Sequence, residues 1–280
     1  MALSTPVERP LGAAIIHPSA IIEHGAKLGA GVSIGPFCHV GADVTLEEGV
    51  TLVSHVSLVG TTSVGARTAI YPFASIGHPP QDLKYSGEPV RLLIGPDCLI
   101  REGVTMNPGT AGGGSETIIG TRSVFLANSH VAHDCIVGDN VILSNNVMLA
   151  GHCKIGDYAI LGGGAAAHQF VRIGAHAFIG GLAGVENDVI PFGIALGNRA
   201  GLAGINVVGL KRRGYDRDAI KDLHGLYRQL FTGEGTLKER VESLSVEFAH
   251  QPEAMQVLDF IREGGDRAIC MPRPSKDELV

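Results

Sequence analysis

The chain has 280 residues, 45% of them hydrophobic, so it is long enough to bury a sizeable core in one large domain or two ordinary ones. Its formal net charge of -6 at pH 7 provides no clustered basic surface, which argues against nucleic acid as a partner. Glu8 and Pro10 precede only a short apolar stretch, so we expect neither a secretory signal nor a membrane span, and favour a cytoplasmic location.

Aliphatic residues recur at every sixth position through most of the chain. The pattern runs over 16–76, resumes over 94–106, then shifts by one residue and continues over 119–185. The fifth position of each sextet is usually small or β-branched, as at Ala20 and Cys98. Because alternate residues of a strand point to the same face, positions one and five both point inward, and water-facing residues fall between them.

The glycine content distinguishes between the possible repeat architectures. The chain has 39 glycines, no tryptophan and only 5% aromatic residues, so its core is built from aliphatic and small side chains. Glycine often occupies position two, as in Ile34-Gly35, where we expect it to let the backbone turn a corner. A period of six does not match a helix, and so much glycine would cost about 1 kcal/mol per helical position. The sextets therefore predict a mainly β fold that resembles the left-handed parallel β-helix, with three sextets in each coil.

Two segments interrupt the repeat, and helical spacing replaces it near the C-terminus. Loops projecting from a rigid scaffold are where function usually lies. We expect helices that begin near Asp216 or Asp218 and end at Gly233, that cover 237–248, and that start again at Pro252. The expected divisions are an N-terminal extension (1–15), the β-helix (16–195) with loops at 77–93 and 107–118, a C-terminal α-helical domain (196–265) and a loose tail (266–280).

Four of the five cysteines occupy inward fifth positions, where we expect small buried hydrophobic residues: Cys38, Cys98, Cys135 and Cys153. Their spacings do not match a zinc site, so no metal is expected. The odd number of cysteines argues against a disulfide framework and favours a reducing compartment.

Histidines are concentrated in the second half of the repeat. Because one coil takes three sextets, His133 stacks on Gly151, and Asp134 lies beside His152, about 4.8 Å away along the axis. A histidine facing a glycine has open space for a substrate, and a backbone N–H there can stabilise developing negative charge. This arrangement suits a general base that deprotonates a hydroxyl for attack on an acyl carbonyl.

Neighbouring residues extend this candidate site. Asp134 follows His133 directly and is a candidate for orienting the imidazole, although consecutive strand side chains normally diverge. His168 and Gln169 fall near the axial line of Gly151 and are expected to line the same groove one coil further on. Histidines elsewhere in the repeat are interpreted as surface residues: His17, His24, His39 and His55.

Several short strings are more specific than the repeat. They cover residues 73–77, 81–85 with 87–89, 129–135, 149–152, 167–170 and 209–214. Together they closely resemble the UDP-N-acetylglucosamine O-acyltransferase family, which carries out the first step of lipid A biosynthesis. The resemblance extends from about His17 to the C-terminal helices.

This resemblance implies a cytoplasmic homotrimer with active sites between subunits, which transfers a 3-hydroxyacyl chain from acyl carrier protein to the sugar 3-hydroxyl without a cofactor. His133 would be the base, and the Gly151 amide would stabilise the oxyanion. Residues implied to bind the sugar or the acyl donor are Gln81, Asp82, Lys84, His130, His152, His168 and Gln169. Residues implied to meet the nucleotide are Asn206, Arg212 and Arg213, and the two arginines are also candidates for guiding the acidic carrier protein.

Simpler roles for some of these residues stay open. Asp82 and Lys84 could pair with each other across their loop, and Lys211 to Arg213 could be an ordinary basic run before a helix.

Gly181 matches the family position that limits acyl length, and a glycine there favours a longer chain. Two departures from the family bear on nucleotide contacts and on whether the acceptor is a hydroxyl or an amine. Asn107-Pro108 replaces a common His-Arg pair, and Val208 replaces a glutamate. The alternative functions are the N-acyltransferase of a later lipid A step, which usually has an additional N-terminal domain, and a hexapeptide-repeat carbonic anhydrase that holds zinc with three histidines.

Overall fold

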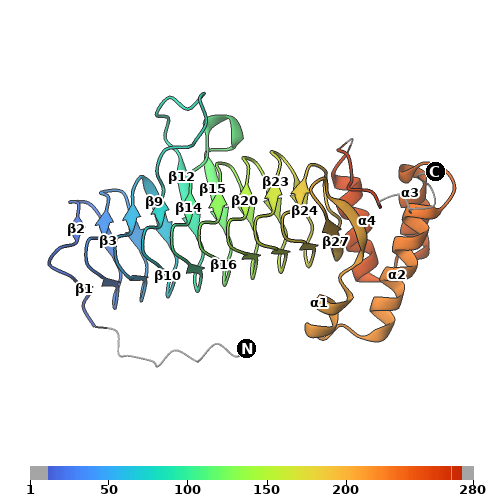
Figure 1. The fold of residues 1–280 in the computed structure, drawn as a ribbon, viewed down its shortest axis with the longest axis horizontal. Helices are drawn as coiled ribbons and strands as arrows, with labels where there is room; N and C mark the ends of the chain where they lie inside the picture. The colour runs from blue at the N-terminus through green and yellow to red at the C-terminus, as the bar shows by residue number, and fades with distance from the viewer. Residues whose placement is uncertain (1–11, 266, 273–280) are drawn as a thin grey trace.

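The protein is an elongated solenoid with a helical domain at its C-terminal end (Figure 1). The computed structural model describes residues 12–265 and 267–272. Successive short strands pass in turn to three sheets, here called A, B and C, so that three strands complete one coil. The predicted left-handed parallel β-helix with a C-terminal helical domain is confirmed.

Each sheet is a ladder of short strands taken from successive coils. Sheet A contains β1 (Ile15–Ile16), β4 (Ser33–Ile34), β7 (Thr51–Leu52), β10 (Ala69–Ile70), β13 (Leu99–Ile100), β16 (Val124–Phe125), β19 (Ile142–Leu143), β22 (Ile160–Leu161), β25 (Phe178–Ile179), β27 (Gly193–Leu196) and β28 (Gly201–Ile205). Sheet B contains β2 (Ile21–Ile22), β5 (His39–Val40), β8 (Ser57–Leu58), β11 (Ser75–Ile76), β14 (Thr105–Met106), β17 (His130–Val131), β20 (Met148–Leu149), β23 (Ala166–Ala167) and β26 (Gly184–Val185). Sheet C contains β3 (Lys27–Leu28), β6 (Thr45–Leu46), β9 (Thr61–Val64), β12 (Arg91–Ile94), β15 (Glu116–Ile119), β18 (Ile136–Val137), β21 (Lys154–Ile155) and β24 (Arg172–Ile173).

The turns between sheets form three edges along the solenoid, called corners AB, BC and CA after the sheets that they join. In the coils discussed below, corner AB comprises residues 162–165 and 180–183, corner BC residues 132–135, 150–153 and 168–171, and corner CA residues 156–159 and 174–177.

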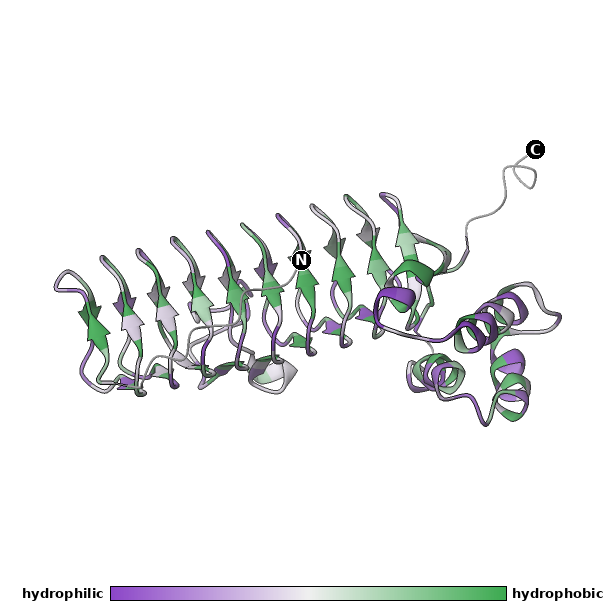
Figure 2. Cartoon of the chain, turned by 90° about the horizontal axis from the view of Figure 1, so that it is seen from below, coloured by the Kyte–Doolittle hydropathy of each residue, from purple (hydrophilic) through white to green (hydrophobic). Residues whose placement is uncertain are grey.

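The core confirms the predicted inward positions. His130 pairs with Met148 and Val131 with Leu149, which is the expected offset of three sextets. From Val32 onward, positions one and five are buried along the solenoid, including all four cysteines predicted to be inside. Figure 2 shows hydrophobic residues recurring on the strands of successive coils. Burying each large aliphatic side chain contributes about 1.5–3 kcal/mol, so the stacked rows account for the stability of the solenoid.

The corners turn at position four of the sextet, not at position two. Phe37, Asp134 and His152 all occupy position four with left-handed φ values of 57°, 60° and 64°. Gly35, at position two, is not left-handed. A Cβ there would lie 1.8 Å from the carbonyl oxygen of Val53 in the next coil. Glycine is therefore needed at this position for the close approach of neighbouring coils, and the expectation that it turns the corner was wrong.

Both interruptions of the repeat leave the solenoid at corner BC. The first joins β11 to β12 and the second joins β14 to β15, so each is flanked by a sheet B strand and a sheet C strand. The second contains one short 3-10 helix, η1 (Ala111–Gly113). The loops end earlier than the expected residues 93 and 118, because β12 and β15 are lengthened and pair with each other over four residues. We call residues 77–90 the first loop and residues 107–115 the second loop.

The solenoid ends in an antiparallel pair, β27 and β28, followed by four helices: α1 (Val207–Arg212), α2 (Arg217–Thr232), α3 (Leu237–Glu247) and α4 (Pro252–Glu263). Helices α2 to α4 lie where the sequence predicted them, and Asp216 caps α2 by accepting the Ala219 N–H. The helices begin at Val207, later than the expected domain boundary at residue 196. Within the described residues, no helix combines the length and apolar character needed to span a bilayer.

The chain beyond α4 is bound to the solenoid over residues 267–272, contrary to the expected loose tail. Asp188 holds it there. The Asp188 carboxylate is fully buried and accepts from Arg172 Nε at 2.6 Å and from Arg267 Nε at 3.0 Å. The Arg172 guanidinium also donates to the Phe260 carbonyl on α4. The remaining expected tail residues, 266 and 273–280, and residues 1–11 of the expected N-terminal extension lie outside the described residues.

Replacing Asp188 with alanine is expected to destabilise the protein by about 3–5 kcal/mol, because it leaves the Arg172 guanidinium without its buried counter-ion. Denaturant unfolding of the two proteins measures this. Glu102→Ala provides the matched control, since Glu102 pairs with Arg101 on the surface without a left-handed backbone, and its loss should cost far less. Equal effects of the two substitutions would contradict the role given to Asp188.

Candidate active site

Corner BC brings His133 against Gly151, as the coil arithmetic predicted. A Cβ added to Gly151 would lie 2.5 Å from His133 Cε1 and 2.7 Å from its Nε2. The imidazole therefore occupies the space that a side chain at residue 151 would need. His133 is 5% exposed, so its ring lies in a dry environment beside the glycine backbone.

His133 and Asp134 form a hydrogen-bonded dyad. The distance from His133 Nδ1 to Asp134 Oδ2 is 2.7 Å. Consecutive strand residues normally point to opposite faces, but the left-handed φ of Asp134 turns its side chain back toward its neighbour. The carboxylate accepts a hydrogen bond from the ring at Nδ1. This favours the tautomer that carries its proton on Nδ1 and leaves a free lone pair on Nε2.

Two threonines that the sequence did not single out hold this dyad. Thr110 donates to both carboxylate oxygens of Asp134, from its backbone N–H at 2.8 Å and from its hydroxyl at 2.6 Å. Thr117 accepts the backbone N–H of Asp134 through its hydroxyl at 2.8 Å. Both threonines come from the second loop or the strand that follows it, and only the folded register brings them to Asp134.

His152 connects the dyad to the first loop. Its ring lies edge-on to His133, with centroids 5.0 Å apart, and stacks on Phe170 at 4.3 Å. Burial lowers the pKa of His152. The charges of Asp134 and Asp82 raise this pKa, and those of His133 and Lys84 lower it. The first loop therefore brings Asp82 and Lys84 within electrostatic range of His152.

The remaining predicted residues of corner BC surround this centre. His130, on β17, is hydrogen-bonded to the Thr105 hydroxyl through Nδ1 at 2.7 Å. Its pKa is lowered, mainly by burial and also by the charge of the nearby His133. His168 and Gln169 are exposed one coil beyond Gly151, as expected, and Gln81 is exposed on the first loop. Asp82 accepts the backbone N–H of Lys84, which shapes the loop locally.

The Gly151 N–H is not used in the hydrogen bonding between coils. It is at position three of its sextet, and proline occupies that position at Pro18, Pro36 and Pro72. Proline has no N–H, so the ladder between coils does not require a donor there. Among the described residues, the Gly151 N–H has no backbone acceptor. A donor beside His133 that needs no internal partner suits an oxyanion site.

Three possible metal ligands meet in this centre: His133, Asp134 and His152 offer atoms within 4.8 Å of one another. However, the Asp134 side chain is fully buried, and its Oδ2 is already hydrogen-bonded to both the Thr110 hydroxyl and His133 Nδ1. These bonds favour a proton-transfer dyad, in which the carboxylate acts on the histidine and not on a cation.

A second group of predicted residues lies at corner CA. His176 is stacked between Tyr158 and Phe192, at 4.9 and 5.3 Å, and its Nε2 lies 3.2 Å from the Tyr215 hydroxyl. Arg213 lies over the Tyr158 ring and donates to its carbonyl at 2.9 Å. Burial lowers the pKa of Arg213.

The other two predicted nucleotide residues differ in their surroundings. Arg212 is exposed on α1. Asn206 is buried and caps α1: its Oδ1 accepts the Gly209 N–H, and its Nδ2 donates to the His176 carbonyl. The structure thus gives Asn206 a structural role, and its contact with a nucleotide stays a prediction.

His176 is expected to make stability fall in mild acid. Burial first, then the positive charge of Arg213, lowers its pKa from 6.5 to about 4, while Asp157 opposes this. Between these pH values the unfolded chain binds a proton that the folded chain excludes, so unfolding becomes easier as the pH falls through this window. His176→Phe keeps the ring stack but cannot titrate. Melting temperatures from pH 7 to 4 should fall more steeply in the unmodified protein; parallel curves would contradict this.

The comparisons with known proteins show the family of this chain. A family described as "Udp N-acetylglucosamine O-acyltransferase; Domain 2" matches residues 188–270, and "Bacterial transferase hexapeptide (six repeats)" matches residues 116–151. The acyl-[acyl-carrier-protein]–UDP-N-acetylglucosamine O-acyltransferase of Methylobacterium radiotolerans is 71% identical over 93% of this chain and 96% of its own length. The chain belongs to the UDP-N-acetylglucosamine O-acyltransferase family. The Caulobacter vibrioides relative of that name is 51% identical, over 92% of this chain and 98% of its own.

Solved structures of this acyltransferase family agree with the fold. The UDP-N-acetylglucosamine O-acyltransferase of Moraxella catarrhalis has a TM-score of 0.88 with 39% identity, and covers 91% of this chain and 99% of its own. The Francisella novicida UDP-N-acetylglucosamine acyltransferase has a TM-score of 0.89 with 33% identity, and covers 94% and 96%.

The residues expected to depart from the family pattern, and Gly181, each have a defined place in the fold. Asn107 is buried, and its Nδ2 donates to the carbonyls of His78 and Pro79 at the start of the first loop. Val208 is 62% exposed on α1. Gly181 lies at corner AB, where an added Cβ would meet the Gly163 carbonyl oxygen at 3.3 Å.

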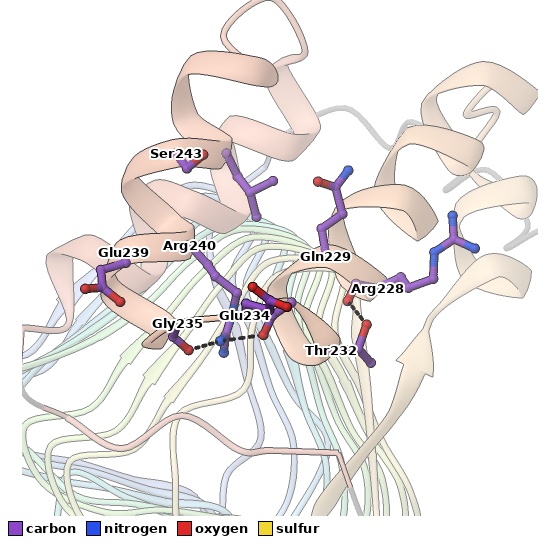
Figure 3. Close-up of a pocket in the computed structure, with 10 residues that line it drawn as sticks. Arg228, Gln229, Thr232, Glu234, Gly235, Glu239, Arg240 and Ser243 are labelled. Carbon is purple, nitrogen blue, oxygen red and sulfur yellow. Dashed lines mark hydrogen bonds between the residues drawn. The ribbon is translucent and has the colours of Figure 1, made fainter.

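A hollow of about 640 Å³ between α2 and α3 lies in the helical domain, away from corner BC (Figure 3). Arg240 projects into it and donates to the carbonyls of Leu230, Gly233 and Gly235. Its guanidinium is thus occupied in closing the turn between the two helices.

Proposed function

We propose that this protein transfers a 3-hydroxyacyl chain from acyl carrier protein to the 3-position of UDP-N-acetylglucosamine, the first step of lipid A biosynthesis. The single observation that supports this most strongly is the His133 imidazole against the unsubstituted Gly151 backbone. It places a base directly against a backbone N–H that has no backbone acceptor among the described residues, with no side chain between them. Family membership gives the substrate class, and the geometry supports the residue roles.

His133 Nε2 takes the proton of the sugar 3-hydroxyl as that oxygen attacks the acyl carbonyl. The carbonyl oxygen becomes negatively charged and accepts a hydrogen bond from the Gly151 N–H. Collapse of the tetrahedral species breaks the bond to the carrier's sulfur, and the proton on Nε2 passes to that leaving thiolate. Asp134 stabilises the transient imidazolium through Nδ1 at 2.7 Å. All atoms are accounted for, so we propose that the reaction needs no metal and no cofactor.

The substrates are held by residues around corner BC and by a separate set. We assign His130, His152, His168, Gln169, Gln81, Asp82 and Lys84 to the sugar and the acyl donor. Arg212 and Arg213 are assigned to the nucleotide diphosphate. Asn206 supports them by capping the N-terminus of α1. The Arg213 Nη1 atom is buried and has no partner within the described residues, so it has a donor left for a phosphate oxygen. The glycine at Gly181 leaves room for a longer acyl chain.

The positions of these residues support a second copy of the chain at each site. His133 lies at corner BC, Gly181 at corner AB and Arg213 at corner CA, on different edges of the same solenoid. Sheet A lies between corners CA and AB, so one ligand reaches all three residues when corner BC of one copy faces sheet A of its neighbour. We therefore propose a homotrimer, which closes with every site equivalent. The free, buried thiols and a carrier protein as donor support a cytoplasmic location.

Mass spectrometry of the product tests this function. The purified protein is incubated with UDP-N-acetylglucosamine and a ladder of 3-hydroxyacyl carrier proteins, and the account predicts one added acyl group, with the longer chains preferred. Mild base then cleaves an ester but leaves an amide, which distinguishes the hydroxyl from an amino acceptor. Light scattering reports the oligomer. Absence of an acylated sugar nucleotide, or stoichiometric zinc in the active protein, would overturn the proposal and favour the carbonic anhydrase alternative.

A further inference from the structure

We propose that Thr110 and Gly113, both on the second loop, are positioning residues that hold the His133–Asp134 dyad in its reactive arrangement. The inference rests on the proposed function, since it takes His133 as the base. Both residues contact Asp134 and act through it. They come from a segment for which the sequence predicted only a loop, so neither was a candidate before the fold was known.

Thr110 fixes the Asp134 carboxylate in the plane that the base needs. Thr110 is 5% exposed, and the Asp134 side chain is fully buried. A buried carboxylate requires hydrogen-bond donors, and Thr110 provides two of them, one for each oxygen. With both oxygens held, Oδ2 is directed at His133 Nδ1. Thr110 thereby keeps the proton on Nδ1 and leaves Nε2 as the basic nitrogen.

Gly113 makes room for the same carboxylate. A Cβ added to it would lie 2.1–2.4 Å from Asp134 Cγ, Oδ1 and Oδ2. At the neighbouring Gly112 and Gly114 an added carbon would meet nothing within 4 Å. Of the three consecutive glycines, the middle one is therefore the one that Asp134 requires. Its backbone covers the carboxylate and keeps water from it.

The second loop also holds the first loop, which carries the proposed substrate-binding residues Gln81, Asp82 and Lys84. Glu88 on the first loop accepts the backbone N–H of Ala111, next to Thr110, at 3.3 Å. Asn107, at the start of the second loop, holds the carbonyls of His78 and Pro79. The two loops thus form one hydrogen-bonded unit over corner BC. This unit aligns the base with the loop that carries Asp82 and Lys84.

Steady-state kinetics of substituted enzymes tests the proposal. Thr110→Val removes the hydroxyl donor and should lower kcat by about 10- to 100-fold, the usual effect of losing a hydrogen bond to a charged group, with the KM for UDP-N-acetylglucosamine changed by less than about threefold. Thr110→Ser keeps both donors and should retain most of the activity. Gly113→Ala should lower kcat as Thr110→Val does, whereas the matched Gly112→Ala should behave as the unmodified enzyme.

A second background separates positioning from loss of stability. If Thr110 acts through Asp134, then adding Thr110→Val to Asp134→Asn should lower kcat by less than about twofold further. A full additional loss, or a drop in kcat that thermal melting of the Thr110→Val protein explains, would overturn the positioning role. If Thr110→Val has normal turnover while His133→Ala is strongly impaired, the positioning role of Thr110 is also overturned, but the proposed function stands. Normal turnover of His133→Ala would instead reject the proposed base itself.

Discussion

Replacing His133 with alanine is expected to lower the rate of acyl transfer by about 10²- to 10⁴-fold, the usual contribution of a general base. The fold should survive, because Asp134 keeps both hydrogen bonds from Thr110 when the imidazole is removed. Turnover with UDP-N-acetylglucosamine and a 3-hydroxyacyl carrier protein measures the first effect. Thermal melting and light scattering should find melting temperature and oligomeric state close to those of the unmodified protein.

His55→Ala is the control for this substitution. His55 lies in an earlier coil between Phe37 and Phe73, and its ring contacts only those exposed aromatic side chains among the ring pairs of the described residues. We expect its loss to leave turnover unchanged. Near-normal turnover of His133→Ala, or equal losses from the two substitutions, would contradict the assignment of His133.

Replacing Gly151 with alanine is expected to lower kcat by about 100-fold, because reactive groups displaced by about 1 Å lose rates of this order. The added methyl group would lie 2.5–3.1 Å from three atoms of the His133 ring, so the ring must move away from the Gly151 N–H. Single-turnover kinetics, which report the chemical step, measure the effect.

Gly163→Ala is the matched control for this second substitution. Gly163 occupies the same sextet position at corner AB, where an added carbon would meet the Asn145 carbonyl oxygen at 3.4 Å, an ordinary contact. We expect its kcat to change little. If Gly151→Ala retains full single-turnover activity, the close approach of His133 to the Gly151 backbone is not needed for the reaction.

The solenoid was predictable from the sequence because its signal repeats. Each sextet is a weak indication, but the phase shared by successive sextets gives the three sheets and their register. The helices α2 and α3 were predictable for a similar reason, since helical spacing recurs along both and Asp216 marks the start of α2. Helix α1 and the β27–β28 pair were not predicted, because they are short and occur once.

The pairing of His133 with Gly151 followed from the coil length alone. The bond between His133 and Asp134 did not, because it depends on the left-handed backbone at Asp134, which the sequence does not mark. Thr110 could not be found either. It reaches Asp134 through a loop that leaves the repeat, and the length of such a loop gives no register.

The corners of the solenoid also explain why one chain does not display a complete site. The family resemblance implies that His133, Gly181 and Arg213 serve one function, but the fold places them on three different edges. A triangular solenoid presents each edge to a different side, so residues on different edges meet only between copies. The proposed trimer is therefore part of the chemistry.

Mixing two inactive variants tests this central claim most directly. His133→Ala and Arg213→Ala proteins are purified separately, dissociated, combined and reassembled, and acyl transfer is then measured. If each site takes His133 from one copy and Arg213 from its neighbour, some sites in the mixed trimers contain both intact residues, and activity is regained. If the mixture stays as inactive as either variant alone while its trimers exchange subunits, the shared site is contradicted.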